Sequence, residues 1–150
     1  MSRLRQFPPL LLARATRLRI QGRVRFPRDR LGEVTATDGE DYQVFRRMVV
    51  DPAEGQPTQP GAHFEVGFHF SRFSPTVNKR LSRLPMPLIA AQPGFRSKTW
   101  MLGTESGAFK GVYEWDTVQD AERYWTSFPM KLMKRRAVPE TLTQEIHAIG

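Results

Sequence analysis

The sequence predicts an α+β protein whose main part, residues 62–150, has the ferredoxin-like βαββαβ order. Three observations predict this order. First, apolar and polar residues alternate strictly in residues 63–70, which predicts a strand. Second, two strand-like runs at 95–102 and 108–115 are separated by a short turn, which predicts a hairpin. Third, a segment with helical periodicity follows the strand, and another follows the hairpin. Residues 1–61 are assigned to a basic N-terminal extension that ends in a proline-rich linker.

The first strand of the domain is predicted from its period of two. Phe64, Val66 and Phe68 fall on one face of the strand, whereas His63 and Glu65 fall on the other. This alternation is typical of a strand with one buried face.

The first helix is predicted to begin at Ser74 and Pro75. Serine is a favourable N-cap residue, and proline is tolerated at the first helical position. Val77, Leu81 and Leu84 then recur at helical spacing until two further prolines interrupt the helix.

The next two strands are predicted as a hairpin. The runs FRSKTWML (95–102) and AFKGVYEW (108–115) are separated by five residues, 103–107, that are rich in turn formers. We therefore expect these strands to be antiparallel neighbours.

A second helix is predicted after the hairpin, because Asp116 with Gln119 three residues later resembles a capping box. Apolar residues recur at helical spacing to residue 128, and another helical piece extends to Pro139. Residues 142–148 alternate again and are predicted as the last strand.

This order is the split-βαβ arrangement, an antiparallel four-stranded sheet with both helices on one face. The other face of such a sheet needs cover. We expect a second copy of the chain to provide it, so that two sheets close a dimeric α/β barrel.

The extension carries the excess charge of the chain. Residues 1–30 hold nine arginines and one acidic residue, and so account for the whole formal net charge of +8. Residues 8–15 can begin a helix, whereas alternation predicts strands at 17–26 and 42–50 that can pair. The segment 51–62 is rich in proline and glycine, and predicts the linker.

Composition excludes several classes of site. The chain has no cysteine, which excludes disulfides, thiolate nucleophiles and iron–sulfur clusters. No stretch approaches the ~20 apolar residues that are needed to span a bilayer, and residues 7–13 do not make a secretory signal. We expect a cytoplasmic protein. We also weigh a peripheral contact with a membrane surface through the arginine arm, the arginine-rich residues 1–30.

Three segments resemble a known family: GFRSKTW at 94–100, GAFKGVYEW at 107–115 and DAERY at 120–124. Together with the strand order they resemble the YdhR-like monooxygenases, within the wider antibiotic-biosynthesis-monooxygenase group of dimeric α/β barrels. The likeness covers roughly residues 63–148. It implies a homodimer with an apolar cavity between sheet and helices, which in the better understood relatives holds an aromatic or polyketide-like substrate that reacts with O₂ without metal or flavin.

Other members of that superfamily are cyclases, isomerases, haem-degrading enzymes or plain binders, so the fold alone does not determine the function. The leading hypothesis is a cofactor-independent, monooxygenase-like protein that acts on a hydrophobic aromatic or polyketide-like molecule. The alternative is a non-catalytic, dimeric small-molecule-binding module.

A cofactor-free oxygenase needs apolar walls, one base and a few hydrogen-bond donors. The candidate catalytic residues are His69, Tyr113 and Trp100. The candidate pocket residues are Phe68, Asn78, Arg96, Trp115, Tyr124 and Trp125. Ordinary core packing of the aromatic residues and a solvated histidine are the competing interpretations. Neither a metal site nor a cofactor-binding site is expected, because two histidines on one strand lack a third ligand.

The arginine arm has three interpretations. It is a solvated face or pairs with the acidic segment 33–41, it lies on an anionic membrane with leucines dipping into the interface, or it contacts the phosphates of a nucleic acid. The last interpretation ranks lowest, because no nucleic-acid-binding motif accompanies the charge. The arginines proposed for the membrane contact are Arg14, Arg17, Arg19, Arg23 and Arg25.

Overall fold

The structure, a computed structural model, describes residues 8–149. Arg3 and Arg5 of the arginine arm lie outside the described residues. The helices are α2 Pro8–Ile20, α3 Pro75–Leu81, α4 Met86–Ala90, α5 Val118–Trp125 and α6 Phe128–Arg135, followed by a 3-10 turn at Pro139–Thr141. The strands are β1 Val24–Arg25, β2 Val34–Thr37, β3 Glu40–Val50, β4 Ala62–Phe68, β5 Phe95–Gly103, β6 Phe109–Trp115 and β7 Thr143–Ala148.

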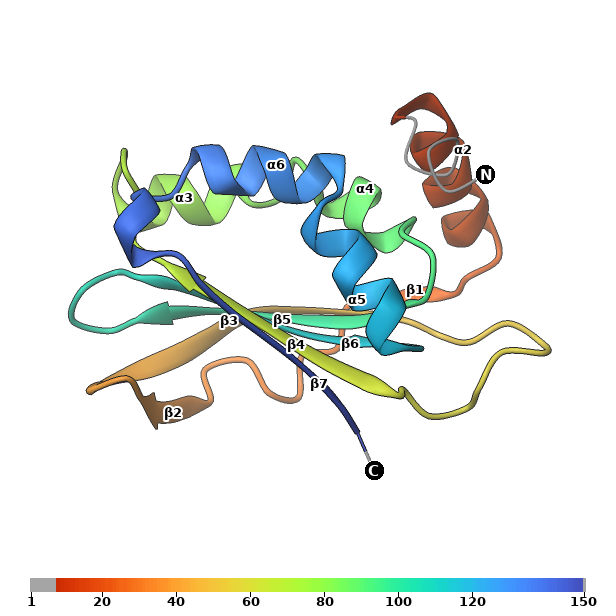
Figure 1. The fold of residues 1–150 in the computed structure, drawn as a ribbon, viewed down its shortest axis with the longest axis horizontal. Coiled ribbons are helices and arrows are strands. Elements are labelled where there is room, and N and C mark those ends of the chain that lie inside the picture. Colours follow the sequence, from red (N-terminus) through yellow and green to blue (C-terminus); the bar gives the residue numbers. More distant parts are fainter. Residues whose placement is uncertain (1–7, 150) are drawn as a thin grey trace.

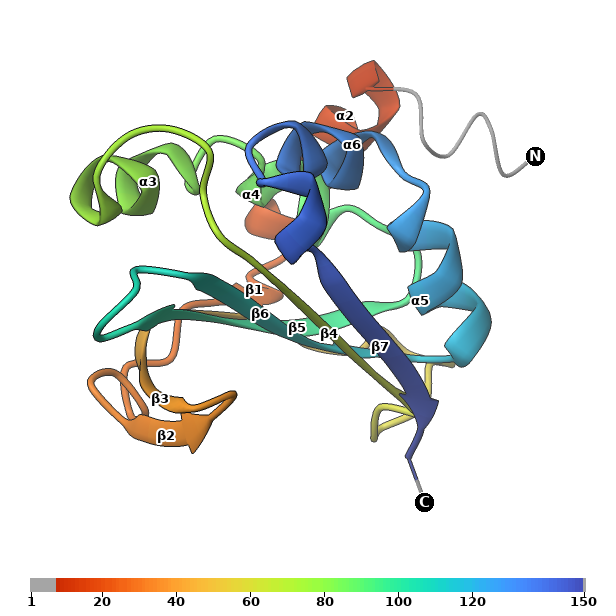
Figure 2. The same cartoon turned by 60° about the vertical axis from the view of Figure 1, so that its left-hand side comes forward.

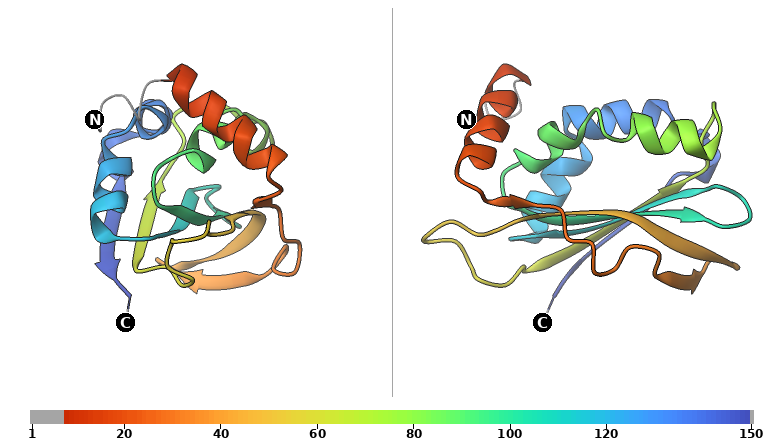
Figure 3. Two further views of the ribbon diagram at one scale, coloured as in Figure 1. Left: turned by 90° about the vertical axis from the view of Figure 1, so that its right-hand side faces the viewer. Right: turned by 180° about the vertical axis from the view of Figure 1, so that it is seen from behind.

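One antiparallel sheet carries all the helices on one side (Figures 1 and 2). Its strands run in the order β1-β3-β5-β6-β4-β7, and β2 pairs with β3. The four strands from β4 onward stand as β7-β4-β6-β5, which is the order of the split-βαβ arrangement. The predicted ferredoxin-like α+β fold is therefore confirmed. Figure 3 shows the helices gathered above the sheet, with β2 on the opposite side.

Strand β3 comes from the segment that we assigned to the extension. It pairs with β5 from Tyr42 opposite Gly103 to Val49 opposite Ser97. The residues before the linker thus add a strand to the sheet of the predicted domain. The predicted strand at 42–50 is found, and its end pairs with β1 through Val24 and Val50.

The prediction of a strand over residues 17–26 is wrong for most of its length. The chain stays helical to Ile20, and only Val24–Arg25 is a strand. Leu11, Ala15 and Leu18 recur at helical spacing and are buried, and Leu11 and Ala15 pack against Ala91 beside α4. This helical period was hidden by arginines at alternate positions. Within residues 8–149, no helix is long and apolar enough to cross a bilayer.

Side chains cap three of the described helices at their N-termini: Ser74 in α3, Thr117 in α5 and Ser127 in α6. The hydroxyl of Ser74 accepts a hydrogen bond from the Val77 backbone N–H, as predicted. The capping box of α5 starts at Thr117 instead of Asp116, because Thr117 bonds to both the backbone N–H and the carboxylate of Asp120. The Asp116 carboxylate accepts hydrogen bonds from side chains outside the helix, and so it cannot act as the cap.

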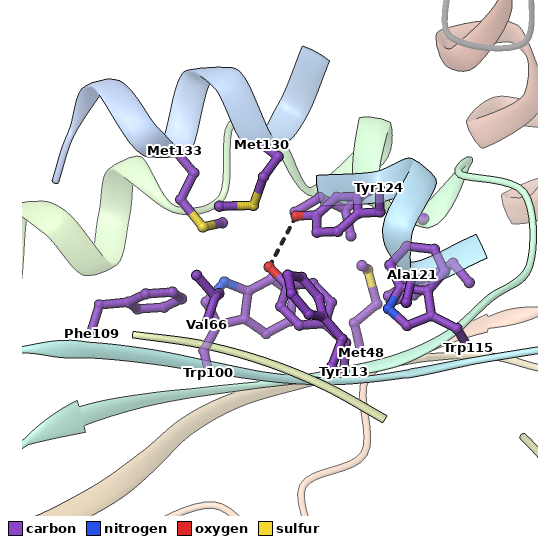
Figure 4. Packing of buried hydrophobic residues seen from close by; sticks show 14 of the residues in the cluster. Met48, Val66, Trp100, Phe109, Tyr113, Trp115, Ala121, Tyr124, Met130 and Met133 are labelled. Carbon is purple, nitrogen blue, oxygen red and sulfur yellow. Dashed lines mark hydrogen bonds between the residues drawn. The ribbon is translucent and has the colours of Figure 1, made fainter. Parts of the chain in front are cut away.

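The main core lies between the sheet and the helices α5 and α6 (Figure 4). The aromatic rings of Trp100, Tyr113, Trp115 and Tyr124 are at most 1% exposed. The hydroxyls of Tyr113 and Tyr124 lie 3.0 Å apart and share a hydrogen bond. Such rings contribute large buried areas, and their edge-to-face and offset contacts hold the helices on the sheet.

The face of the sheet that points away from the helices is only partly bare. Tyr42, Val44 and Met101 form a second, smaller apolar cluster there. Towards β4 and β7 the face is polar, with the rings of His63 and His147 stacked at 4.8 Å. The homodimer stays a prediction, and light scattering in solution would test it.

The docking of α2 yields a stability prediction. Leu18 is 2% exposed and belongs to the main core, whereas Leu12 on the same helix is 51% exposed. Leu18→Ala is expected to lower the free energy of unfolding by about 2–5 kcal/mol, because it leaves a cavity in a packed interior. Leu12→Ala is expected to change it by about 0.5 kcal/mol at most. Urea unfolding measures both, and equal losses would contradict this packing of α2.

Candidate functional site

A cavity of about 330 Å³ lies between the sheet and the helices α3, α4 and α6. The floor of the cavity is formed by Phe68, Trp100 and Phe109 from three neighbouring strands, and Met133 of α6 lies over them. Figure 4 shows Met133 above Trp100 and Phe109. The described residues that line it include no aspartate and no glutamate. The volume is at the lower end of the range for small-molecule sites, and the walls are mostly apolar.

A larger hollow of about 490 Å³ lies on the surface between α2, β3 and the segment that joins β1 to β2. Arginines line much of it. None of the candidate catalytic residues from the sequence lines this hollow. The smaller cavity is the candidate site, because it contains Trp100 and the buried amine of Lys98.

Lys98 enters the cavity floor from β5. Its side chain is fully buried, and its Nζ atom has no hydrogen-bond partner in the structure of residues 8–149. Instead, Nζ lies 4.5 Å from the ring centroid of Trp100, 4.6 Å from that of Tyr113 and 5.2 Å from that of Phe109. Buried lysines are rare unless they are paired, so this unpaired amine indicates a functional group.

The local sequence explains why the lysine fits here. Lys98 and Trp100 alternate along β5 and face the helices, and the residue opposite Trp100 on β6 is Gly111. A Cβ atom at Gly111 would lie only 3.2 Å from the Cε atom of Lys98 and 3.0 Å from the Tyr113 ring. The missing side chain therefore leaves the space through which the aliphatic stem of Lys98 passes.

The surroundings of Lys98 disfavour its charged form. Burial is the largest cause that holds the pKa of Lys98 well below the usual lysine value, and the positive charges of Arg46 and Arg136 lower it further. The uncharged amine is therefore far more populated than in an exposed lysine. An uncharged amine has a free lone pair, and can accept a proton or attack an electrophile.

Arg136 reaches the cavity from the end of α6 and is held by Asn78. Its Nη2 atom donates to the Asn78 side-chain oxygen at 2.9 Å and to the Asn78 carbonyl at 3.2 Å. The Asn78 amide nitrogen in turn donates to the carbonyl of Arg72 at 3.0 Å. Asn78 lines the cavity, and it positions the guanidinium of Arg136.

Arg46 approaches from β3. Its Nη1 atom donates to the Ser82 hydroxyl at 2.6 Å, and its guanidinium lies 5.4 Å from the ring centroid of Trp100. Burial, followed by repulsion from Arg83, lowers the pKa of Arg46 to about 10. Arg46 is thus still a cation at neutral pH. It lines the larger hollow and not the cavity, but its positive charge, like that of Arg136, lowers the pKa of Lys98.

Of the nine candidate residues from the sequence, three line the cavity: Phe68, Asn78 and Trp100. Tyr113 lies beneath it, with its ring against Lys98. Burial raises the pKa of Tyr113 well above the usual tyrosine value, so its hydroxyl stays protonated and bonded to Tyr124. Tyr113 and Tyr124 are therefore core residues that support the floor of the site.

His69 does not reach the cavity. Strand β4 ends at Phe68, and the alternation that turns Phe68 inward turns the side chain of His69 out to solvent. His63 and His147 lie on the face of the sheet away from the helices. The part of the chain that the structure covers holds no group of three His, Asp or Glu residues suited to a metal ion.

Arg96 does not line the cavity either. The register of β5 shifts between Phe95 and Ser97, which takes Arg96 out of the alternation shared by Lys98 and Trp100. Its guanidinium donates to the Pro57 carbonyl at 2.7 Å and to Asp116 at 3.1 Å. Arg96 therefore fastens the linker to the sheet.

Two tryptophans predicted for the pocket lie elsewhere. Trp115 is fully buried at the far end of the core, 4.9 Å from the Tyr124 ring, and its indole N–H has no partner in the described part of the chain. Trp125 is half-buried, and the Nζ atom of Lys134 lies 3.8 Å above its ring. Both fall outside because they lie on α5 or against it, and α5 contributes no residue to the lining of the cavity; it packs over the other end of the sheet from α3 (Figure 1).

Comparison with known proteins places the fold. No family model and no curated protein matches the sequence significantly. Among solved structures, a ferredoxin-fold protein related to antibiotic biosynthesis monooxygenases from Listeria monocytogenes 4b F2365 matches at 13% identity, over 79% of this chain and 70% of the other, with a TM-score of 0.58. The chain has this ferredoxin-like fold.

Two further structures share the fold. The haem-degrading enzyme LmHde from Listeria monocytogenes matches at 12% identity, over 85% of this chain and 97% of the other, with a TM-score of 0.57. A major regulator of staphylococcal pathogenesis matches at 12% identity, over 83% of this chain and 76% of the other, with a TM-score of 0.56. One fold thus occurs in proteins described in different terms, and the function must be argued from the site.

The lowered pKa of Lys98 predicts a pH-dependent stability. Between the pKa of Lys98 in the folded protein and its higher value in the unfolded chain, the unfolded chain binds more protons, so stability rises with pH. Lys98→Met removes this dependence. At pH 7 the variant is expected to be more stable than the wild type, by about 1.4 kcal/mol for each unit by which burial lowers the lysine pKa towards 7.

The difference in the free energy of unfolding between Lys98→Met and the wild type is expected to shrink as the pH approaches about 10, because Lys98 then loses its proton in the unfolded chain as well as in the folded protein. Urea unfolding at several pH values measures it, with Lys131→Met on the exposed side of α6 as the matched control. A difference that is constant with pH would contradict the titration of Lys98.

Proposed function

We propose that this chain is a cofactor-independent, monooxygenase-like protein that acts on a hydrophobic aromatic or polyketide-like molecule bound in the cavity. One observation carries the proposal: the floor of an apolar cavity holds an unpaired, buried amine, Lys98 Nζ, stacked among three aromatic rings. The monooxygenase-related fold supports it.

The first step is the removal of a proton from the substrate. Lys98 Nζ accepts a proton from an acidic O–H or C–H group, because burial and the nearby guanidinium groups disfavour its own charged form. The product is an ammonium beside a substrate anion. Arg136, which lines the cavity, and Arg46, which lies beside the Trp100 ring, are then positive charges near this anion and stabilise it.

The second step is the reaction of the anion with O₂. For a methylene group between two aromatic rings, the carbanion transfers electrons to O₂, and a carbon–oxygen bond forms. The resulting peroxide takes back the proton from Lys98, and loss of water leaves a carbonyl group. One O₂ thus supplies one carbonyl oxygen and one water, and the substrate provides all the electrons. Trp100, Phe68 and Phe109 keep the anion away from bulk water.

Oxygen uptake tests this proposal. The wild type is expected to consume O₂ with at least one member of a panel of anthrones, quinols and polyphenols. Lys98→Met is expected to lower kcat by ~10²–10⁴-fold, the usual contribution of a positioned base. The rate is expected to fall as the pH is lowered, because the amine becomes protonated.

Lys131→Met provides the control for the oxygen assay, since its side chain is exposed on α6 and does not line the cavity. Absence of O₂ uptake with every compound would remove the enzymatic proposal. An unchanged rate in Lys98→Met would remove the role of Lys98.

A second candidate function is a non-catalytic binding module at an anionic membrane surface. Helix α2 exposes Leu10, Leu12 and Ile20, which are 49%, 51% and 82% exposed, and Arg17 and Arg19 are exposed on the same helix. Apolar and cationic side chains on one surface helix suit the interface of an anionic bilayer.

Arg23 and Arg25, two of the arginines predicted to contact the membrane, have partners within the chain. Arg25 pairs with Asp51 at 2.8 Å, and Arg23 donates to the Asp51 carbonyl at 3.0 Å and to Gln56. The pairing of Arg23 and Arg25 leaves α2 as the surface that would contact lipid.

Flotation with lipid vesicles distinguishes this second function. The wild type is expected to float with phosphatidylserine-containing vesicles and not with phosphatidylcholine alone, and Leu12→Glu with Ile20→Glu is expected to abolish flotation. Val34→Glu is the control, because Val34 is 52% exposed on β2, on the other side of the sheet. Equal flotation of both variants, or none of the wild type, would contradict the membrane contact.

A further inference from the structure

We infer that Lys98 also forms a covalent imine with hydrophobic aldehydes or ketones that enter the cavity. The inference shares its cavity with the proposed function but does not depend on any reaction with O₂. It rests on the position of one atom: Lys98 Nζ is buried, has no hydrogen-bond partner within residues 8–149, and belongs to a side chain that lines an apolar cavity of about 330 Å³.

Attack on a carbonyl carbon requires an amine with a free lone pair, which an ammonium lacks. The groups that face Lys98 from the surrounding elements are the cations Arg46 and Arg136 and the rings of Trp100, Phe109 and Tyr113. None of them is an anion that would hold the ammonium form. Burial acts in the same direction, since it lowers the pKa of this lysine.

The other four lysines of the chain have different surroundings. Lys110 pairs with Asp38 at 2.6 Å and with Glu65 at 3.2 Å. Lys134 donates to the Trp125 carbonyl at 2.8 Å. Lys79 and Lys131 are exposed, so water stabilises their charged forms. Lys98 alone combines full burial with contact to a cavity, which makes selective reaction at this one amine a specific expectation.

The cavity suits an imine. Its apolar floor of Phe68, Trp100 and Phe109 binds a carbonyl compound through an aromatic or aliphatic body, and excludes much of the water that would hydrolyse the adduct. Because Gly111 leaves space beside the Cε atom, the stem of Lys98 can reach the floor without displacing the strand.

The step is a condensation in which atoms balance. The lone pair of Nζ forms a bond to the carbonyl carbon, and the carbonyl oxygen takes up the two amine protons and leaves as water. The product is a carbon–nitrogen double bond between Lys98 and the ligand. Cyanoborohydride, added as an external reductant, delivers hydride to the imine carbon and fixes the adduct as a stable secondary amine.

Site-resolved labelling of the wild-type protein tests the inference. The protein is treated at pH 7 with 2-naphthaldehyde and cyanoborohydride, and peptide mass spectrometry measures the rate at each of the five lysines. Lys98 is expected to react about tenfold faster than any other lysine, or more, because each unit by which a pKa lies lower raises the uncharged fraction at neutral pH about tenfold. Raising the pH towards 10 is expected to reduce this preference.

Two controls relate the labelling to the cavity. Naphthalene, which has no carbonyl group, is expected to slow labelling of Lys98 and not that of Lys131. Lys98→Met is expected to lose the fast phase, while near-ultraviolet circular dichroism reports whether the variant keeps its packing. Labelling of Lys98 at the rate of Lys131, or no labelling of Lys98 at all, would overturn the inference.

The oxygen assay and the labelling assay fail independently. A protein that consumes O₂ but leaves Lys98 unlabelled overturns the imine and retains the proposed oxygenase. A protein that is labelled at Lys98 but consumes no O₂ with any compound supports the imine and removes the oxygenase.

Discussion

All nine residues of strand β5 are buried, because neighbouring strands pair with both of its edges and side chains pack on both of its faces. Two of these residues, Arg96 and Lys98, carry basic groups into the interior. These two residues differ in their hydrogen-bond partners. Arg96 has two backbone carbonyls and the Asp116 carboxylate as partners, whereas Lys98 has none in the described chain. This contrast separates a structural contact from a candidate reactive group.

A buried amine without a partner is costly as an ammonium, and the cost falls when it is uncharged. The nearby guanidinium groups of Arg46 and Arg136 act in the same direction. They have the opposite effect once the amine has taken a proton from a ligand, because the ligand is then an anion among three cations. The arrangement therefore disfavours an isolated charge on Lys98, and under the proposed mechanism it favours an ion pair between Lys98 and an acidic ligand.

Much of the fold could be predicted from the sequence, because the strict alternation of β4 and the turn between β5 and β6 are local signals. The helical conformation of residues 17–20 could not be predicted, because arginines at alternate positions give the period of two that is typical of a strand. The helical spacing of the buried residues Leu11, Ala15 and Leu18 is the competing signal. In the site, Trp100, Phe68 and Asn78 were found by position on their elements. Lys98 is not among the residues that the sequence singles out, because its lack of a partner within the described residues and the space at Gly111 depend on the packing of two strands.

The fold is shared with an enzyme and a regulator at about 12% identity, so the function of this chain must be argued from the residues in and around the cavity. Some of these residues come from β3. A register shift between Val44 and Arg46 lets Phe45 line the cavity and lets Arg46 reach the Trp100 ring. Strand β3 precedes the linker and lies outside the family resemblance read from the sequence. Residues before the linker thus supply Phe45 to the wall of the cavity and place the Arg46 cation against the Trp100 ring, so both parts of the chain build the surroundings of Lys98.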